Sequence, residues 1–201
     1  MRRVVVLALL ALALPMAAWA DEITFTNQFG TVSATDSGII SKGSQLTSYN
    51  GIQAPKGHAL GTVSYATGAL LTGSIATGGT FSATGSSFDI VGNNKLVPKG
   101  PIFTGAFTTA VDPITWTLVN TIGQEKVFDL HGDITGTLYN GRVVSGSTTQ
   151  TIDFLNGQQF KQGMGHIKMG SGTLTTPEPG TLGLLGTGLL GLAGIFRRKK
   201  V

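Results

Sequence analysis

The sequence has 201 residues and contains no cysteine. This absence excludes disulfide bonds, thiolate metal sites, iron–sulfur clusters and a thiol nucleophile. Disulfides are the usual covalent reinforcement of small folds outside the cytosol. Any folded part of this chain must therefore be held together by side-chain packing and backbone hydrogen bonds.

Charge is also scarce, and its distribution is uneven. Only 12% of the residues are charged, with 14 Lys and Arg against 10 Asp and Glu. Six of these cations and one anion lie within residues 1–20 and 177–201, so the body at residues 21–176 has eight cations, nine anions and a net charge of −1. The sequence pI of about 9.5 therefore reflects the terminal segments. The body has no basic surface for nucleic acid, and we expect no nucleic-acid partner.

The N-terminal segment has the three parts of a secretory signal peptide. A basic start at residues 2–3 precedes an apolar run at residues 4–14, and Ala18 and Ala20 occupy the small positions of a cleavage site. We expect signal peptidase to cut after Ala20, so that residues 1–20 are removed and the rest of the chain is exported.

The C-terminal segment contains a short motif, an apolar stretch and a basic end. The stretch at residues 181–196 has no charge, and as a helix it would be about 24 Å long, slightly less than a hydrocarbon core of about 30 Å. Cations after such a stretch resist translocation, so we expect one membrane helix at 181–196 before processing. The motif consists of Pro177, Glu178, Pro179 and Gly180, and the basic end consists of Arg197, Arg198, Lys199 and Lys200.

This arrangement resembles the PEP-CTERM sorting signal of bacterial exported proteins, which is also catalogued as the ice-binding protein C-terminal domain. The resemblance covers about residues 176–201, where the Pro-Glu-Pro triplet, a glycine-rich apolar helix and an arginine-led basic cluster follow one another. It implies recognition by a membrane-embedded cysteine protease, an exosortase, that cuts near the motif and releases or transfers the protein. The protein is then expected in the inner membrane before processing and at the cell surface or outside the cell afterwards.

The body alternates polar and apolar residues at a period of two, which is typical of β-strands. In segments such as residues 23–26 and 114–118, threonine alternates with branched or aromatic residues. Asn140-Gly141, between two alternating runs, favours a hairpin with a type I′ turn. Residues 35–58 are expected to form a long loop with at most one strand. We predict one all-β domain at residues 21–176 and favour an antiparallel β-sandwich, with a barrel or a β-solenoid as alternatives.

The densest polar cluster is Asp129-Leu130-His131-Gly132-Asp133. On a strand, a period of two places Asp129, His131 and Asp133 on one face, where their oxygen and nitrogen atoms are ligands for a divalent cation. Neighbouring side chains on one strand face are about 7 Å apart, too far for all three to reach one ion unless Gly132 forms a bulge. We therefore expect a solvated strand face without a metal or cofactor, and keep metal binding as the alternative.

Hydrolysis is the enzymatic alternative. Besides His131, the sequence contains only His58 and His166, which we expect in a loop and at a strand end rather than acting as bases. The sequence has no G-x-S-x-G elbow and no HExxH, P-loop, dinucleotide or EF-hand motif. Two carboxylates at a suitable separation would serve a glycoside hydrolase, but spacing marks no particular pair. The candidates are Asp89, Asp112, Glu125, Asp129, Asp133 and Asp153.

Exposed aromatic rings would indicate a carbohydrate site, because they stack on sugar rings. Trp116 shares a strand face with two aliphatic residues and is expected in the core. Tyr49, Tyr65 and Tyr139 border expected loops or turns and are the candidates for such a site. A face of threonine rows that orders water as ice does would require a repeated T-x-T grid, whereas the threonines here are scattered along the chain.

These patterns predict an exported, non-enzymatic protein of the cell surface or extracellular matrix with a structural or adhesive role. The alternative is a carbohydrate-binding module that recognises extracellular polysaccharide, and the third interpretation is a secreted hydrolase. The expected partners are signal peptidase, an exosortase-like membrane protease and the membrane itself through residues 181–196.

Overall fold

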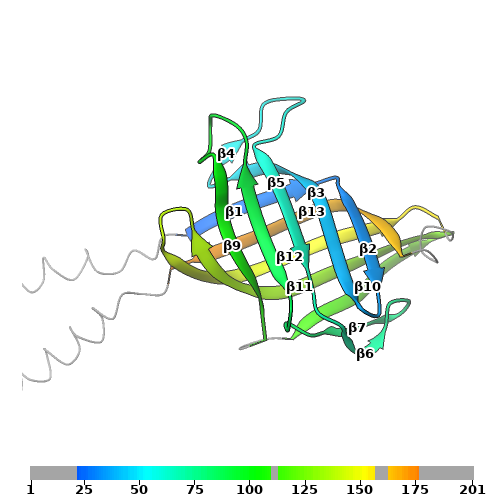
Figure 1. Cartoon of the computed structure of the whole chain (residues 1–201). Coiled ribbons are helices and arrows are strands. Elements are labelled where there is room, and N and C mark those ends of the chain that lie inside the picture. Colours follow the sequence, from blue (N-terminus) through cyan, green and yellow to red (C-terminus); the bar gives the residue numbers. More distant parts are fainter. Residues whose placement is uncertain (1–21, 110–112, 157–162, 177–201) are drawn as a thin grey trace, which may run out of the picture. The chain divides into compact units, whose positions relative to one another are not determined.

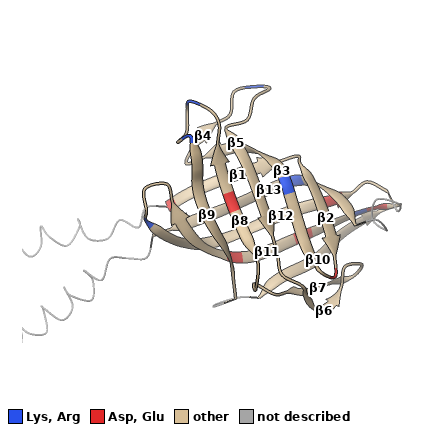
Figure 2. Cartoon of the chain, viewed as in Figure 1, with Lys and Arg blue, Asp and Glu red and all other residues tan. Residues whose placement is uncertain are grey.

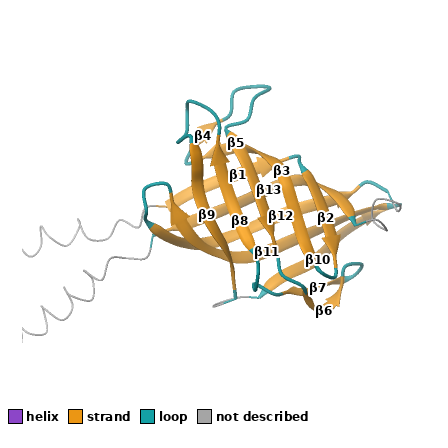
Figure 3. Cartoon of the chain, viewed as in Figure 1, coloured by secondary structure: helices purple, strands orange, loops and turns teal. Residues whose placement is uncertain are grey.

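Antiparallel β-strands make up most of the structure (Figures 1 and 3). The computed structural model describes residues 22–109, 113–156 and 163–176, and these residues contain no helix. The predicted all-β class is confirmed, whereas the predicted signal peptide and membrane helix lie outside the described residues. The strands are β1 (Glu22–Gln28), β2 (Thr31–Thr35), β3 (Gly38–Tyr49), β4 (Ile52–Gln53), β5 (Gly61–Ala66), β6 (Leu70–Ser74), β7 (Gly78–Phe81), β8 (Ser87–Gly92), β9 (Gly100–Thr108), β10 (Ile114–Ile122), β11 (Glu125–Leu138), β12 (Val143–Phe154) and β13 (Met164–Thr175).

Eight strand positions form a closed ring in the same order as in the sequence. β1 and β2 share one position, because both pair with β13 on one side and with β3 on the other. The other positions are β3, β5, β8, β9, β11, β12 and β13. The ring closes where Thr175 of β13 lies opposite both Ser145 of β12 and Glu22 of β1. Residues Glu22–Thr175 thus form one compact unit, an up-and-down β-barrel.

A short sheet of β10, β7 and β6 adjoins the barrel. β10 pairs with the first half of β11, and β7 and β6 follow it in order, whereas β9 pairs with the second half of β11. In the sequence, β6 directly follows β5, β7 directly precedes β8, and β10 directly follows β9. The short sheet is therefore a continuation of three barrel strands.

The closed ring shows that the predicted β-sandwich is wrong, and so is the β-solenoid alternative, whereas the barrel alternative is correct. Alternation at a period of two is the same in a sandwich and a barrel, because each presents one buried and one solvated sheet face. What distinguishes the two folds is the pairing of β13 with β1. That contact joins the first and last strands, and local sequence patterns do not report it.

The prediction of a long loop with at most one strand at residues 35–58 is also wrong, because the 12-residue β3 and the two-residue β4 both lie there. The inward side of β3 combines aliphatic residues with Ser41 and Ser44, which are 1% and 0% exposed. In the pairing of β3 with β5, the register shifts between these two serines. Buried hydroxyl residues and a bulge together interrupt the apolar alternation that would have revealed the strand.

The predicted hairpin at Asn140-Gly141 connects β11 and β12, but its turn is not type I′. Of these two residues only Gly141 has a positive φ, of 80°. Its N–H donates to the carbonyl oxygen of Leu138 at 2.9 Å, and the Leu138 N–H donates to that of Arg142 at 2.9 Å. These bonds define a three-residue loop with a type I turn followed by a left-handed glycine. The type I′ turn occurs instead at Asn50-Gly51, between β3 and β4, where both residues have positive φ.

Aromatic side chains form much of the core. The rings of Tyr65 and Phe88 are stacked with centroids 5.7 Å apart. Trp116 of β10 stacks on Phe128 of β11 at 4.4 Å, and its indole N–H donates to the carbonyl oxygen of Ile75 at 2.9 Å. Trp116 is 1% exposed, so its predicted place in the core is confirmed.

Polar side chains also lie inside the barrel, where Asn27, Ser44, Thr148 and Gln150 form what we call the buried amide cluster. Asn27 Nδ2 donates to Gln150 Oε1 at 2.9 Å and to Ser44 Oγ at 2.7 Å. Gln150 Nε2 donates to Thr148 Oγ1 at 2.9 Å and to Asn27 Oδ1 at 3.3 Å. Gly170 of β13 lies against both amides, because a β-carbon there would overlap them. The cluster therefore connects β1, β3 and β12 across the interior.

Candidate functional site

The polar row predicted on β11 lies on the outer side of the barrel wall. His131 Nδ1 is 2.9 Å from Thr149 Oγ1, and Thr151 Oγ1 donates to Asp129 Oδ1 at 2.7 Å. β11 pairs with β12 without a register shift from residue 126 to residue 137, so no bulge brings Asp129, His131 and Asp133 together. Among the described residues, no group of three His, Asp or Glu side chains is arranged to hold a metal ion. The metal alternative therefore gains no support from this row.

The other two histidines lie on elements away from β11. His58 is in the loop between β4 and β5, and His166 is near the start of β13, with its Nδ1 3.2 Å from the Gly30 carbonyl oxygen. Neither histidine is hydrogen-bonded to a carboxylate within the part of the chain that the structure describes. Of the candidate carboxylates, Asp89 is on β8, Glu125, Asp129 and Asp133 are on β11, Asp153 is on β12, and Asp112 lies outside the described residues.

Two of the three candidate tyrosines are unavailable to a ligand at the surface. Tyr49 is 6% exposed and Tyr65 is 2% exposed, whereas Tyr139 in the β11–β12 loop is 61% exposed. The candidate role of Tyr49 and Tyr65 in lining a carbohydrate site is therefore not supported, because both rings are buried. The Tyr65 and Ser41 hydroxyls are buried without a hydrogen bond of normal geometry. Burial raises the pKa of the Tyr65 phenol far above its usual range, and the nearby Ser41 offsets this only in part.

The outer surface of β1, β13 and β12 carries an ordered set of hydroxyl side chains, which we call the hydroxyl face. The strand register aligns them in two rows across the three strands. Neighbours within a row are about 4.8 Å apart, and the rows are about 7 Å apart along the strands. The first row is Thr24, Thr173 and Ser147, and the second row is Thr26, Ser171 and Thr149.

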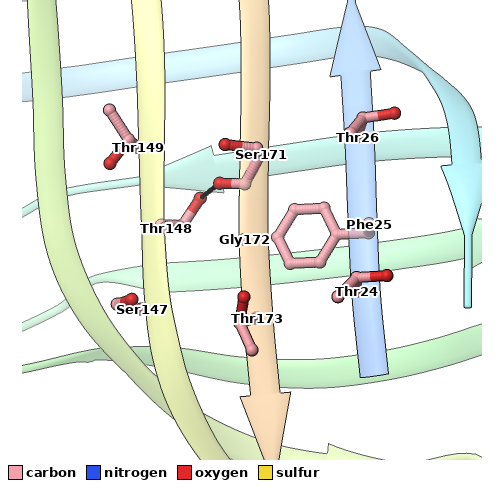
Figure 4. A pocket seen from close by; sticks show the side chains of 9 residues that line it. All are labelled: Thr24, Phe25, Thr26, Ser147, Thr148, Thr149, Ser171, Gly172 and Thr173. Carbon is pink, nitrogen blue, oxygen red and sulfur yellow. Dashed lines mark hydrogen bonds between the residues drawn. The ribbon is translucent and has the colours of Figure 1, made fainter. Parts of the chain in front are cut away.

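The hydroxyl face lines an open hollow of about 240 Å³ (Figure 4). Besides the six hydroxyl residues, the lining includes Phe25, Thr148 and Gly172. Gly172 lies between the two rows on the central strand, and the Phe25 ring is directed toward it from β1. A β-carbon at Gly172 would overlap that ring. The interior packing therefore requires a residue without a side chain at the middle of this hollow.

A second hollow, of about 620 Å³, adjoins the first. The two share Ser147 and Thr173, and the second extends to Asp133 on β11 and Thr108 on β9. The register places Thr108 opposite Asp133 and Asp133 opposite Ser147, so the first row of the hydroxyl face continues into this hollow. The row therefore spans five strands, from β1 to β9.

Four of the six hydroxyls have no partner within the described residues. Thr26 Oγ1 is 3.0 Å from Thr47 Oγ1, and Thr149 is bound to His131. In contrast, the side-chain oxygens of Thr24, Ser147, Ser171 and Thr173 make no hydrogen bond to any part of the chain that the structure describes. Each of these hydroxyls offers a donor and acceptor lone pairs. The face therefore offers hydrogen bonds to a ligand without first breaking bonds within the protein.

The hydroxyl face is uncharged, and charged residues are sparse over the barrel (Figure 2). The lining of the adjoining hollow includes one carboxylate, Asp133, and no Lys or Arg. On the opposite wall, the outward positions are more varied. There β5 and β9 also carry outward hydroxyl residues, but these do not form an uncharged surface. Charged or apolar side chains lie among them, namely Lys42 of β3 and Asp89 and the exposed Val91 of β8. Uncharged hydroxyl rows are thus a feature of one wall.

The hydroxyl face was not predicted, because β1 is far in the sequence from β12 and β13. A local signal exists, since hydroxyl residues occupy alternate positions at 24–26 in β1, 145–149 in β12 and 171–175 in β13. The threonines are scattered along the chain, as expected, but the strand register assembles them into rows. The pairing of β13 with both β1 and β12 is the information that the sequence lacks.

The model for the PEP-CTERM protein-sorting motif matches residues 175–200. The chain therefore carries the sorting signal that residues 177–180 and the segments after them predicted, and this signal indicates exosortase-dependent sorting to the cell surface. No curated protein and no solved structure matches the chain. The predicted membrane stretch at 181–196 lies outside the described residues, and the residues that are described include no helix long and apolar enough to cross a bilayer.

Proposed function

We propose that this protein is exported and processed by an exosortase, and that it has a non-enzymatic, structural or adhesive role at the cell surface or in the extracellular matrix. The observation that carries the proposal is the position of the sorting motif. The matched segment begins at Thr175, which is also the last residue of β13. A closed barrel is thus followed directly by a sorting signal.

The two expected processing sites are consistent with this role. Glu22, the first residue of β1, lies opposite Thr175, the last residue of β13. The expected cut after Ala20 and a cut in the sorting motif would both fall just outside these paired residues. Both reactions would therefore leave every strand of the barrel complete.

The distribution of polar groups favours binding over catalysis. Outside the polar row of β11, the candidate catalytic residues lie on several different elements, whereas the hydroxyl face presents several uncharged hydroxyls side by side. The imidazole that contacts this face, His131 against Thr149 Oγ1, has no hydrogen bond to a carboxylate in the described part of the chain, so the third group that orients a general base is missing from the described residues. The hydroxyl face is suited to forming many weak hydrogen bonds, which supports an adhesive role and favours carbohydrate binding as the second candidate function.

Replacement of Glu178 tests the sorting step. We expect Glu178→Ala to accumulate at full length in the inner membrane, because the motif that the exosortase recognises is altered. Cell fractionation and intact-mass measurement would detect this change. The matched control is Glu125→Ala, which removes a glutamate of β11 outside the motif and should be processed as the wild type is. Normal release of the Glu178→Ala protein would contradict the proposal.

A chain ending at Thr176 tests the role of the whole tail. It lacks the motif, the apolar stretch and the basic end but keeps all of β13, which ends at Thr175. We expect this chain to be exported and absent from the membrane fraction. If it fractionates as the full-length precursor does, the tail does not direct localisation.

The non-enzymatic part of the proposal has a separate test. We expect the processed protein to turn over no member of a panel of ester and glycoside substrates. If the wild type turns over a substrate and a folded Asp129→Asn or Asp133→Asn variant does not, the protein is instead a hydrolase with its site on the outer face of β11.

A further inference from the structure

We propose that the hydroxyl face is a binding site for a neutral polysaccharide. The proposal rests on the proposed function only for the extracellular location, where such polymers occur. It assigns a ligand class and specific residues to the adhesive role. Its central residues are Thr24, Thr173 and Ser147, which form one row across β1, β13 and β12.

Hydrogen-bonding capacity is the first argument. The hydroxyls of this row have no side-chain partner within the described residues. A sugar hydroxyl both donates and accepts, as the serine and threonine hydroxyls do, so the two surfaces are complementary in either direction. β13 is hydrogen-bonded on both sides, to β12 and β1. The row is therefore held in place before binding, which lowers the entropy cost of association.

Charge is the second argument, and it selects a neutral polymer. The six residues of the hydroxyl face carry no charge, and the adjoining hollow has Asp133 but no cation. A polyanionic chain would meet a carboxylate with no Lys or Arg in the lining to compensate for the repulsion. A neutral chain has no such cost, and Asp133 can accept hydrogen bonds from its hydroxyls.

The geometry favours a polymer over a single sugar. One neutral hydrogen bond contributes only about 0.5–1.5 kcal/mol net, and neither hollow is lined by an exposed aromatic ring on which a sugar could stack. The first row continues through Asp133 to Thr108, so successive polar groups lie about 4.8 Å apart across five strands. A chain lying along this row engages several groups at once, and each further contact adds to the binding of a linked ligand.

Affinity electrophoresis of the processed protein tests the inference, with dextran and hydroxyethyl cellulose as neutral probes and alginate as the polyanionic probe. The test variant combines Thr24→Val, Ser147→Ala and Thr173→Val, which removes three hydroxyls and keeps β-branched residues in the strands. The matched control combines Thr62→Val, Ser64→Ala and Thr104→Val on the outer side of β5 and β9. Far-ultraviolet circular dichroism and the thermal midpoint establish that both variants are folded.

We expect at least one neutral probe to retard the wild type more strongly than alginate does. Removing three hydrogen bonds should weaken that retardation at least about tenfold, whereas the control variant should stay within about twofold of the wild type. Lack of retardation by both neutral probes, equal binding by the folded test variant, or stronger retardation by alginate would each overturn the inference. The sorting test with Glu178→Ala is independent of these binding measurements. The ligand assignment can therefore fail while the proposed sorting and location stand, and the two failures are distinguishable.

Discussion

The buried amide cluster leads to a specific prediction about stability, because it joins an early strand of the barrel to a late one through the interior. Asn27 is in the first strand and Gln150 is in the last strand but one. Their side chains exchange hydrogen bonds of 2.9 Å and 3.3 Å in the interior. Gln150→Ala would remove both bonds and the bond from Gln150 to Thr148. The Asn27 carbonyl oxygen would then be left in the core without its Gln150 donor.

The expected loss of stability follows from two terms. A buried polar atom without a partner costs about 1–3 kcal/mol. Truncating a side chain that is 0% exposed also leaves a cavity, which costs at least about 1 kcal/mol more. We therefore expect Gln150→Ala to lower the free energy of unfolding by about 3 kcal/mol, a large part of the total for a domain with about 5–15 kcal/mol of stability.

Urea unfolding of the processed protein measures this loss. The sequence contains two tryptophans, and after removal of residues 1–20 only Trp116 remains; it is buried, so its fluorescence reports the transition. Gln53→Ala on the exposed strand β4 is the control, and its stability should stay within about 0.5 kcal/mol of the wild type. A cycle that adds Asn27→Ala should show a coupling of about 1–2 kcal/mol. A loss below about 1 kcal/mol for Gln150→Ala, or strict additivity of the two substitutions, would refute the reasoning.

Two further substitutions test the aromatic core. Burial raises the pKa of the Tyr65 phenol, so above about pH 10 the unfolded chain releases a proton that the folded chain retains, and stability falls by about 1.4 kcal/mol per pH unit. Urea titrations at several pH values should show that Tyr65→Phe loses this part of the alkaline destabilisation, whereas the control Tyr139→Phe keeps it. Identical pH profiles for Tyr65→Phe and the wild type would contradict the burial argument. Trp116→Ala should lower stability by about 3–5 kcal/mol, as followed by circular dichroism, because it removes the stack on Phe128 and the bond to Ile75. Tyr139→Ala should stay within about 0.5 kcal/mol, and a similar small effect of Trp116→Ala would show that this contact contributes little.

Local patterns predicted the features of this chain that depend on neighbouring residues. Alternation indicated strands and the core position of Trp116, and the order of motif, apolar stretch and basic end indicated the sorting signal. In β3 the same reasoning failed, because Ser41 and Ser44 occupy inward positions where an apolar residue is expected. The burial of Ser44 is compatible with the fold because its hydroxyl belongs to the buried amide cluster, whereas the Ser41 hydroxyl is buried without such a bond. The partners that make a serine an acceptable core residue come from other strands.

The features that escaped prediction depend on which strands are neighbours. Ring closure, the buried amide cluster and the hydroxyl face all require β1, β12 and β13 to lie side by side. Each of these strands has a local pattern that fits either a sandwich or a barrel. Only the register shows that Thr24, Thr173 and Ser147 are in one row, because a shift by one residue would turn the same side chains toward the core.

The position of β13 also limits where the exosortase can cut without destroying the barrel. Leu174 is 0% exposed and packs in the core, and the next residue, Thr175, pairs with both Glu22 and Ser145. A cut before Thr175 would remove hydrogen-bond partners from two strands at once and shorten the strand that holds the centre of the hydroxyl face. A cut within residues 177–180 leaves the closing strand and both hydroxyl rows intact. The sorting reaction and the binding surface are therefore compatible only because the motif begins after the last paired residue of the barrel.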